Sequence, residues 1–270
     1  MWGLSIALLV ALVVRVLIRS WLRHEEPLSV SGASVGMNLG NTGGDLSQID
    51  KIASTGVRWI RLEQDFPADV ARADALELNV LMLLKSRRTF AEGDLTTDQH
   101  IAAIVAGMRK FPDVGVYEIL NEPNNLWWDG VTAEEYAAIC RGVRPHLSDG
   151  QRLAGPAVAG DLPRSLEYVS EVLRLAPGCL DIVTVHVYGD AADVAAYVEA
   201  IPGDLPVWLT ETAYSPDQTE EEQRDQLEGA LRAQQSSPRW EVTFPYHWSV
   251  DRRFPIKGTA TEALLRRALL

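Results

Sequence analysis

Two glutamates each stand near the end of an apolar run of the chain. Glu122 closes VGVYEILNE, and Glu211 lies within PVWLTETAY. Pro123 explains why the first run stops, since proline removes a backbone donor and disfavours helical geometry in its predecessor, but it does not explain the carboxylate. Glycoside hydrolysis requires two carboxyl groups, one to protonate the leaving oxygen and one to act as nucleophile or base. The pair therefore predicts a glycosidase if the fold brings the two groups together.

Apolar, β-branched or aromatic runs recur along the chain and predict eight buried strands. These runs occupy residues 34–39, 57–63, 79–86, 114–122, 152–158, 181–189, 206–214 and 241–250. Segments of helical period separate them, at residues 45–55, 68–78, 97–111, 132–147, 162–176, 193–201, 219–235 and 258–270. Thr132 with Glu135, and Thr219 with Glu222, match the capping box of a helix start. The alternation predicts an α/β fold, a (β/α)8 TIM barrel over residues 34–270.

A barrel of this kind gathers the C-terminal ends of its strands at one mouth, where active sites are built. Strands four and seven lie on opposite sides, so Glu122 and Glu211 are expected to face each other across the mouth. A separation of about 5 to 5.5 Å between the carboxyl groups predicts retention of anomeric configuration, and about 6.5 to 9.5 Å predicts inversion. Like charges in unequal surroundings split their pKa values, which keeps one group protonated near neutral pH.

Composition narrows the ligand class. The formal net charge of -12 argues against a nucleic-acid partner, which needs clustered Lys and Arg, and favours a neutral or sparsely charged ligand. No glycine-rich phosphate loop follows the first predicted strand, and no Cys/His spacing suggests zinc, so no cofactor or metal is expected. Cys140 and Cys179 are interpreted as buried thiols in preference to a disulfide.

The N-terminal 24 residues are predicted to form a hydrophobic helix that serves as a membrane anchor or an uncleaved signal, followed by a linker at residues 25–33. Arg15, Arg19 and Arg23 share one helical face, which also suits a helix lying in the membrane interface. They follow the apolar run, which by the positive-inside rule would leave the barrel in the cytoplasm. The expected location is nevertheless the cell envelope, on its periplasmic or extracellular face, with the orientation of the anchor left open.

The sequence resembles glycoside hydrolase clan A, the retaining (β/α)8 glycosidases. ILNEPNN ending the fourth strand and the glutamate of LTET ending the seventh carry the resemblance, which spans about residues 34–265. YEILNEPNNLWW followed by TAEEYAAICRGVRP is most similar to the family 39 type and to bacterial exopolysaccharide hydrolases, with families 5 and 128 as near neighbours.

The resemblance implies roles for individual residues. Glu122 would be the general acid/base and Glu211 the nucleophile. Asn121 would hydrogen-bond the sugar 2-hydroxyl, and Arg61 and Tyr188 would support the nucleophile. Tyr188 would belong with His186 to the His-x-Tyr motif of strand six. Trp248 would form the floor under the scissile sugar. Beyond the resemblance, Trp127 and Trp128 are candidate sugar-stacking walls, and Asn41 is a further polar group at the first strand end.

Two other classes of function remain open from the residues alone. A metal-dependent sugar isomerase barrel would use Glu122, His186 and Glu211 as ligands of a divalent cation. A catalytically silent, membrane-tethered barrel would only bind glycans, although it would not need paired acids. The favoured hypothesis is a metal-free retaining glycosidase that cleaves β-linked polysaccharide, with a bacterial exopolysaccharide as one candidate. The sugar, the cleavage pattern and the oligomeric state stay undetermined.

Overall fold

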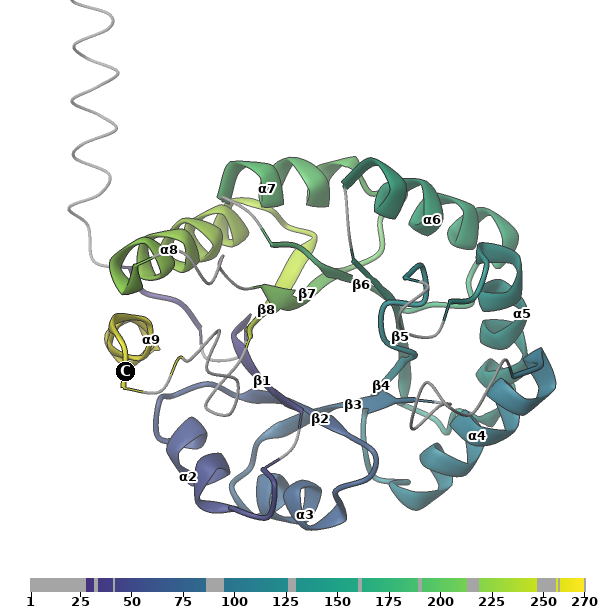
Figure 1. Cartoon of the computed structure of the whole chain (residues 1–270), viewed down its shortest axis with the longest axis horizontal. Coiled ribbons are helices and arrows are strands. Elements are labelled where there is room, and N and C mark those ends of the chain that lie inside the picture. The colour runs from purple at the N-terminus through teal and green to yellow at the C-terminus, as the bar shows by residue number, and fades with distance from the viewer. Residues whose placement is uncertain are drawn as a thin grey trace, which may run out of the picture.

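Eight parallel strands follow one another around a barrel in chain order (Figure 1). The computed structural model describes residues 28–31, 34–40, 42–85, 95–125, 130–159, 162–188, 191–212, 219–246, 256 and 258–269. The strands are β1 (Gly36–Gly40), β2 (Trp59–Glu63), β3 (Asn79–Leu84), β4 (Val116–Ile119), β5 (Arg152–Val158), β6 (Ile182–His186), β7 (Val207–Thr212) and β8 (Trp240–Pro245). Parallel bridges from Val35 to Thr243 and from Asn38 to Tyr246 join β8 to β1. The predicted (β/α)8 barrel is therefore confirmed.

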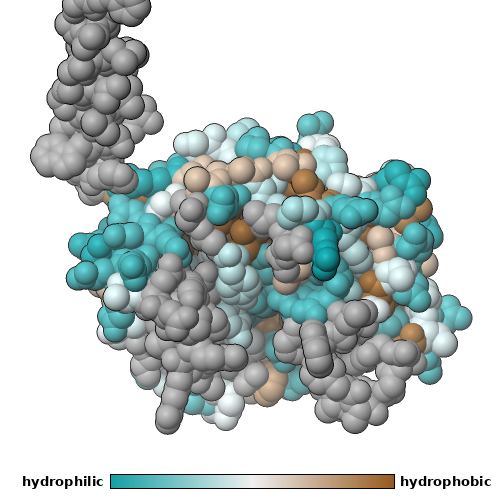
Figure 2. All heavy atoms as spheres, turned by 45° about the horizontal axis from the view of Figure 1, so that its top comes forward, coloured by the Kyte–Doolittle hydropathy of each residue, from teal (hydrophilic) through white to brown (hydrophobic). Residues whose placement is uncertain are grey.

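Helices surround the barrel on its outside (Figure 1). They are α2 (Ser47–Ala53), α3 (Pro67–Ala75), α4 (Thr97–Lys110), α5 (Ala133–Val143), the short 3-10 helix η3 (Arg144–His146), α6 (Leu162–Leu175), α7 (Ala191–Ala200), α8 (Glu220–Ser236) and α9 (Ala260–Leu269). Both predicted capping boxes are present, and each closes the first turn by a reciprocal pair of bonds between side chains and backbone. The face of the molecule in Figure 2 shows mostly hydrophilic residues, with small hydrophobic areas between them.

The core has an outer and an inner layer. The outer layer lies between strands and helices, because alternate strand residues point away from the barrel axis. The inner layer fills the barrel and comprises Leu81, Val116, Ala154, Ile182, Trp208, Val242 and Phe244. Near the N-terminal ends of the strands, the Trp208 ring lies 4.8 Å from that of Trp59 and 6.1 Å from that of Phe244. The barrel is therefore a packed core at this end.

The segment before β1 lies against the barrel. Leu28 and Val30 are buried in the cluster that contains α9, and the Val30 N–H donates to the Ala268 carbonyl at 2.9 Å. Part of the predicted linker therefore packs on the domain. Residues 1–24, with the predicted anchor, lie outside the described residues, and within the described part of the chain no helix is long and apolar enough to span a bilayer. Cys140 and Cys179 are buried free thiols, as predicted.

Close approach of β1 to the inner layer makes Gly36 a sensitive position. A Cβ atom there would lie 2.3 Å from Cε1 of Phe244, a ring that is held by its buried neighbours. We expect Gly36→Ala to destabilise the fold by about 1–3 kcal/mol through overpacking. Gly115→Ala is the matched control, because its Cβ would meet no atom within 4 Å. Urea denaturation midpoints measure the difference, and equal midpoints for the two variants would contradict this packing argument.

Candidate active site

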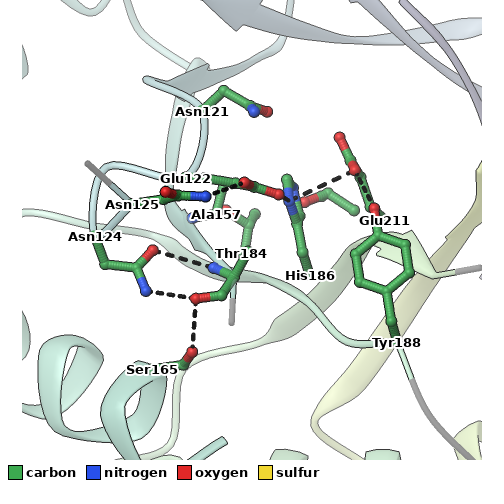
Figure 3. Close-up of polar contacts among 12 residues, drawn as sticks. Asn121, Glu122, Asn124, Asn125, Ala157, Ser165, Thr184, His186, Tyr188 and Glu211 are labelled. Carbon is green, nitrogen blue, oxygen red and sulfur yellow. Dashed lines mark hydrogen bonds and ion pairs between the residues drawn. The ribbon is translucent and has the colours of Figure 1, made fainter. Parts of the chain in front are cut away.

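The structure brings Glu122 and Glu211 together at the C-terminal ends of the strands. Glu122 follows β4, Glu211 lies in β7, and the two are only 9% and 7% exposed. One carboxylate oxygen of each, together with a ring nitrogen of His186, lie within 4.8 Å of one another (Figure 3). The side chains of strands on opposite sides of the barrel thus converge on one small polar cluster.

A β-bulge turns Glu211 into the mouth. Trp208 points into the barrel and Leu209 into the outer layer, so strict alternation would direct Glu211 outward as well. Val185 pairs with Leu209, but the next residue of β6, His186, pairs with Glu211. The extra residue in β7 reverses the alternation, as bulges beside active sites do. Asn38 donates from Nδ2 to the carbonyl oxygen of Thr210 at 3.3 Å and supports the bulge.

Backbone geometry after β4 aims Glu122. Leu120 and Glu122 have φ angles of 61° and 49°, a left-handed conformation that is uncommon outside glycine. Such residues cost of order 1–3 kcal/mol and persist where surrounding contacts hold them. Here the Leu120 N–H donates to the Leu84 carbonyl at 2.9 Å, and the Glu122 N–H donates to the Ala157 carbonyl at 3.1 Å. Hydrogen bonds to β3 and β5 therefore keep the chain in this conformation.

Two hydrogen bonds hold the Glu211 carboxylate. Arg61 Nη1 donates to Oε1 at 2.8 Å, and the Tyr188 hydroxyl donates to Oε2 at 2.5 Å. Burial by itself raises the pKa of Glu211, but the charges of His186 and Arg61 and these two hydrogen bonds outweigh it and lower the pKa below its ordinary value. Glu211 is therefore ionised at neutral pH and one of its oxygens lies near Glu122.

Arg61 connects three acceptors across the barrel mouth. Its Nε donates to Glu118 at 2.6 Å, Nη1 to Glu211 at 2.8 Å, and Nη2 to Oδ1 of Asn121 at 2.9 Å. The residue is 3% exposed. Burial lowers its pKa, but the charges of Glu118 and Glu211 more than compensate and raise it. The guanidinium is thus a permanent cation with a fixed orientation.

Glu122 is held differently. His186 Nδ1 lies 3.0 Å from Oε1, and Asn125 Nδ2 donates to Oε2 at 3.2 Å (Figure 3). The contact with His186 requires one proton between Nδ1 and Oε1, whichever atom carries it. Glu122 therefore lies beside a proton, whereas Glu211 lies beside a fixed positive charge. The two carboxyl groups have unequal surroundings, as the sequence predicts for an acid and a nucleophile.

Three supporting residues were not predicted from the sequence. Glu118, Asn124 and Asn125 all contact the cluster or its loops. Asn124 accepts from the Ala159 N–H at 3.1 Å and donates to the Ala159 carbonyl at 2.5 Å, which ties the loop after β4 to the end of β5. A signal for Glu118 existed, because it shares the inward face of β4 with Val116 in an otherwise apolar run.

Four predicted site residues, Asn41, Trp127, Trp128 and Trp248, lie outside the described residues. The remaining six, Glu122, Glu211, Arg61, Asn121, His186 and Tyr188, belong to the hydrogen-bonded cluster. Tyr188 lies at the mouth beside Glu211 and is 45% exposed. Within the residues that the structure describes, it is the one large hydrophobic residue that is exposed to this degree.

The trio of Glu122, His186 and Glu211 also has the donor types and spacing of a cation site. Arg61 and Tyr188, however, already donate to the two oxygens of Glu211. A divalent cation at this carboxylate would lie close to the buried guanidinium, and like charges at such distances repel strongly. The arrangement favours acid–base chemistry of the carboxyl groups over metal ligation.

A (β/α)8 barrel with two close carboxylates at the ends of strands four and seven defines a glycosidase of clan A type. The chain belongs to the family described as "Glycosyl hydrolase catalytic core", which matches residues 119–265 and so includes both glutamates. No curated protein sequence matches significantly.

Solved structures share the fold. A GH128 (subgroup II) endo-beta-1,3-glucanase from Sorangium cellulosum has 20% identity and a TM-score of 0.67, over 87% of this chain and 98% of the other. A GH128 (subgroup I) endo-beta-1,3-glucanase from Amycolatopsis mediterranei, in complex with laminaripentaose, has 15% identity and a TM-score of 0.62, over 87% and 99%. ZgEngAGH5_4, in complex with a cellotriose, has 16% identity and a TM-score of 0.69, over 88% and 96%. The closer kinship to family 39 finds no support in these matches.

The contacts of Glu211 predict its response to loss of the Tyr188 hydroxyl. Because its folded-state pKa is lowered, the ionised carboxylate stabilises the fold above roughly pH 4.3, and this contribution is lost as pH falls through the folded-state pKa. Tyr188→Phe removes one hydrogen bond, so we expect the pKa of Glu211 to rise, its contribution to stability to shrink, and the loss of that contribution to be complete at a higher pH. Carbon-13 NMR titration of labelled glutamate, assigned with Glu211→Gln, measures the shift.

Tyr197→Phe is the matched control for this titration. Tyr197 lies in the outer layer of the core, and the polar group beside its hydroxyl is Ser165, which does not belong to the cluster around Glu211. We expect this variant to leave the titration of Glu211 unchanged. If Tyr188→Phe and Tyr197→Phe give the same titration curve as the unmodified protein, the hydrogen bond from Tyr188 does not set the charge of Glu211.

Proposed function

We propose that this protein is a retaining β-glucan hydrolase in which Glu211 is the nucleophile and Glu122 the general acid/base. The observation that carries the proposal is the approach of one oxygen of each carboxylate to within 4.8 Å. Such a close approach of the nearest oxygens supports the spacing of about 5 to 5.5 Å between carboxyl groups that is typical of retaining enzymes over the about 6.5 to 9.5 Å of inverting enzymes.

The unequal surroundings of the two carboxyl groups support their assignment. Glu211 is kept ionised by Arg61 and Tyr188 and can attack the anomeric carbon. Glu122 lies beside the proton of its contact with His186 and can protonate the leaving oxygen as the glycosidic bond breaks. In the second step Glu122 takes a proton from water, which attacks the glycosyl ester and releases Glu211.

Asn121 is suited to bind the sugar beside the reacting carbon. Arg61 Nη2 donates to its Oδ1 at 2.9 Å, which fixes the orientation of the amide. A hydrogen bond from this amide to the 2-hydroxyl would strengthen as the oxocarbenium-like transition state develops. Arg61 would then position both the nucleophile Glu211 and the Asn121 amide that hydrogen-bonds to the sugar.

The substrate class is argued from charge and from the similar structures. The chain carries a net charge of -12, which repels polyanionic polysaccharides and favours neutral glucans. Two of the similar structures are endo-beta-1,3-glucanases, and a third holds a cellotriose. A β-1,3-glucan is therefore the first candidate and a β-1,4-glucan the second, ahead of an acidic exopolysaccharide.

Digestion of a polysaccharide panel tests the proposal directly. Laminarin, curdlan, soluble cellulose oligosaccharides and an acidic bacterial exopolysaccharide are incubated with the protein, with and without a chelator. We expect β-1,3-glucan to be hydrolysed equally in both conditions, with the β-anomer as the first product seen by proton NMR. Initial release of the α-anomer would exclude double displacement, and activity lost on chelation and restored by a divalent cation would favour the isomerase-like use of the same residues.

Substitution of the two glutamates separates their roles. We expect Glu122→Gln to lower kcat on laminarin by about 10²–10⁴, the usual contribution of general acid–base catalysis, but to spare the first step on a dinitrophenyl glycoside, whose leaving group needs no proton. Glu211→Gln is expected to abolish turnover of both substrates. Glu134→Gln, on the exposed surface of α5, is the control. Near-normal rates for Glu211→Gln on either substrate would remove it as the nucleophile.

A further inference from the structure

A third carboxylate lies beneath the two catalytic candidates. Glu118 is 0% exposed and accepts from Arg61 Nε at 2.6 Å through Oε2. Its other oxygen, Oε1, has no hydrogen-bond partner among the described residues. Glu118 lies within β4, with its side chain directed to the barrel interior, and neither step of double displacement uses its carboxylate.

Structural stability alone is a weak reason for such a group. Taking a carboxylate out of water is costly, and a buried oxygen without a hydrogen-bond donor adds to that cost. A buried ion pair is often no more stable than well-packed apolar side chains of the same volume. Because Arg61 already has a counterion in Glu211, a second buried carboxylate on the same guanidinium needs a separate explanation.

The reaction itself changes the charge around Arg61. In the first step a bond forms between a Glu211 oxygen and the anomeric carbon, the bond to the leaving oxygen breaks, and the proton of Glu122 passes to that oxygen. Glu211 is then a neutral ester. Without another anion, the buried Arg61 guanidinium would be left uncompensated in the glycosyl-enzyme intermediate, which is strongly unfavourable. Glu118 is a second anion in contact with Arg61, and no bond to Glu118 forms or breaks in this step.

We propose that Glu118 is a positioning residue that holds the Arg61 guanidinium from inside the barrel and shares its charge throughout the reaction. Before the attack, Glu211 is oriented by Arg61 without receiving its whole positive charge, which keeps the carboxylate nucleophilic. After the attack, Glu118 remains as the counterion of Arg61. This inference rests on the proposed role of Glu211 as the nucleophile and adds a residue to that site.

Several titratable and charged groups face Glu211 and Glu118 and can contribute to any measured pH dependence. Glu211 is faced by Arg61 from β2, by His186 and Tyr188 at the end of β6, and by Glu122 after β4. Glu118 is faced by Arg61 and by the buried Tyr136 of α5, whose hydroxyl donates to the Ile119 carbonyl. Tyr246 at the end of β8 adds a further phenol beside Tyr188.

Glu118→Gln separates charge sharing from simple orientation, because it keeps the volume and an acceptor oxygen but removes the negative charge. Under the proposal, the full charge of Arg61 then acts on Glu211. The acid limb of the pH profile, where kcat/KM on laminarin declines at low pH as Glu211 becomes protonated, is expected to move down by about one pH unit. We also expect kcat to fall by on the order of tenfold with little change in KM. If Glu118 only held Arg61 in place, a loosened guanidinium would move the acid limb upward.

Two further variants complete the experiment. Asp69→Asn is the matched control, because Asp69 is a buried carboxylate that accepts from the backbone and hydroxyl of Thr42, away from the cluster; its acid limb is expected to match that of the unmodified protein. Glu118→Asp keeps the charge and is expected to keep the acid limb even if Glu118→Gln does not fold. A shifted acid limb in Glu118→Asp would overturn the proposal.

The outcomes also distinguish this inference from the proposed function. If Glu211→Gln is inactive while Glu118→Gln has an unchanged or raised acid limb, only the role of Glu118 is wrong. If Glu211→Gln retains near-normal turnover, the proposed nucleophile is wrong and the argument for Glu118 falls with it. A lowered acid limb in Glu118→Gln, an unshifted one in Glu118→Asp and an inactive Glu211→Gln together support both.

Discussion

The polar mouth of this barrel depends on one buried guanidinium. Arg61 joins Glu118, Glu211 and Asn121, which come from β4, β7 and the segment after β4, through three hydrogen bonds between 2.6 and 2.9 Å. A planar guanidinium imposes directions as well as charge on its partners, so their relative positions are set together. The carboxylates would otherwise repel each other in a buried environment, and the cation makes their proximity tolerable.

The backbone departs from regular geometry where the site is formed. β7 contains a bulge immediately before Glu211, and the chain leaves β4 through left-handed conformations at Leu120 and Glu122. Both departures redirect a side chain toward the mouth. The regular parts of the fold supply the free energy that holds them, through the packed inner layer around Trp208 and the helices outside. Strain and stability are thus located in different parts of the barrel.

The site carries more functional information than the fold. Structures of 15% to 20% identity share the barrel with this chain, and barrels of this type support many unrelated reactions. The glycosidase family restricts the chemistry to a glycosyl hydrolase reaction, and the arrangement of Glu122, Glu211 and Arg61 supports the proposed catalysis by carboxyl groups. Substrate preference in such barrels depends on the loops beyond the strands, which differ in length and sequence between barrels.

The sequence alone determined the fold and the two central residues. Alternating strand and helix periodicity predicted the eight strands and the eight α-helices of the described residues, because apolar spacing reflects burial directly, and motifs at two strand ends pointed to Glu122 and Glu211. Only the tertiary structure decided how these groups interact. Strict alternation along β7 would have turned Glu211 outward, and the reversal arises from pairing with β6. The charge shared by Glu118, Arg61 and Glu211 likewise depends on distances between strands that lie far apart in the chain, and no local pattern encodes those distances.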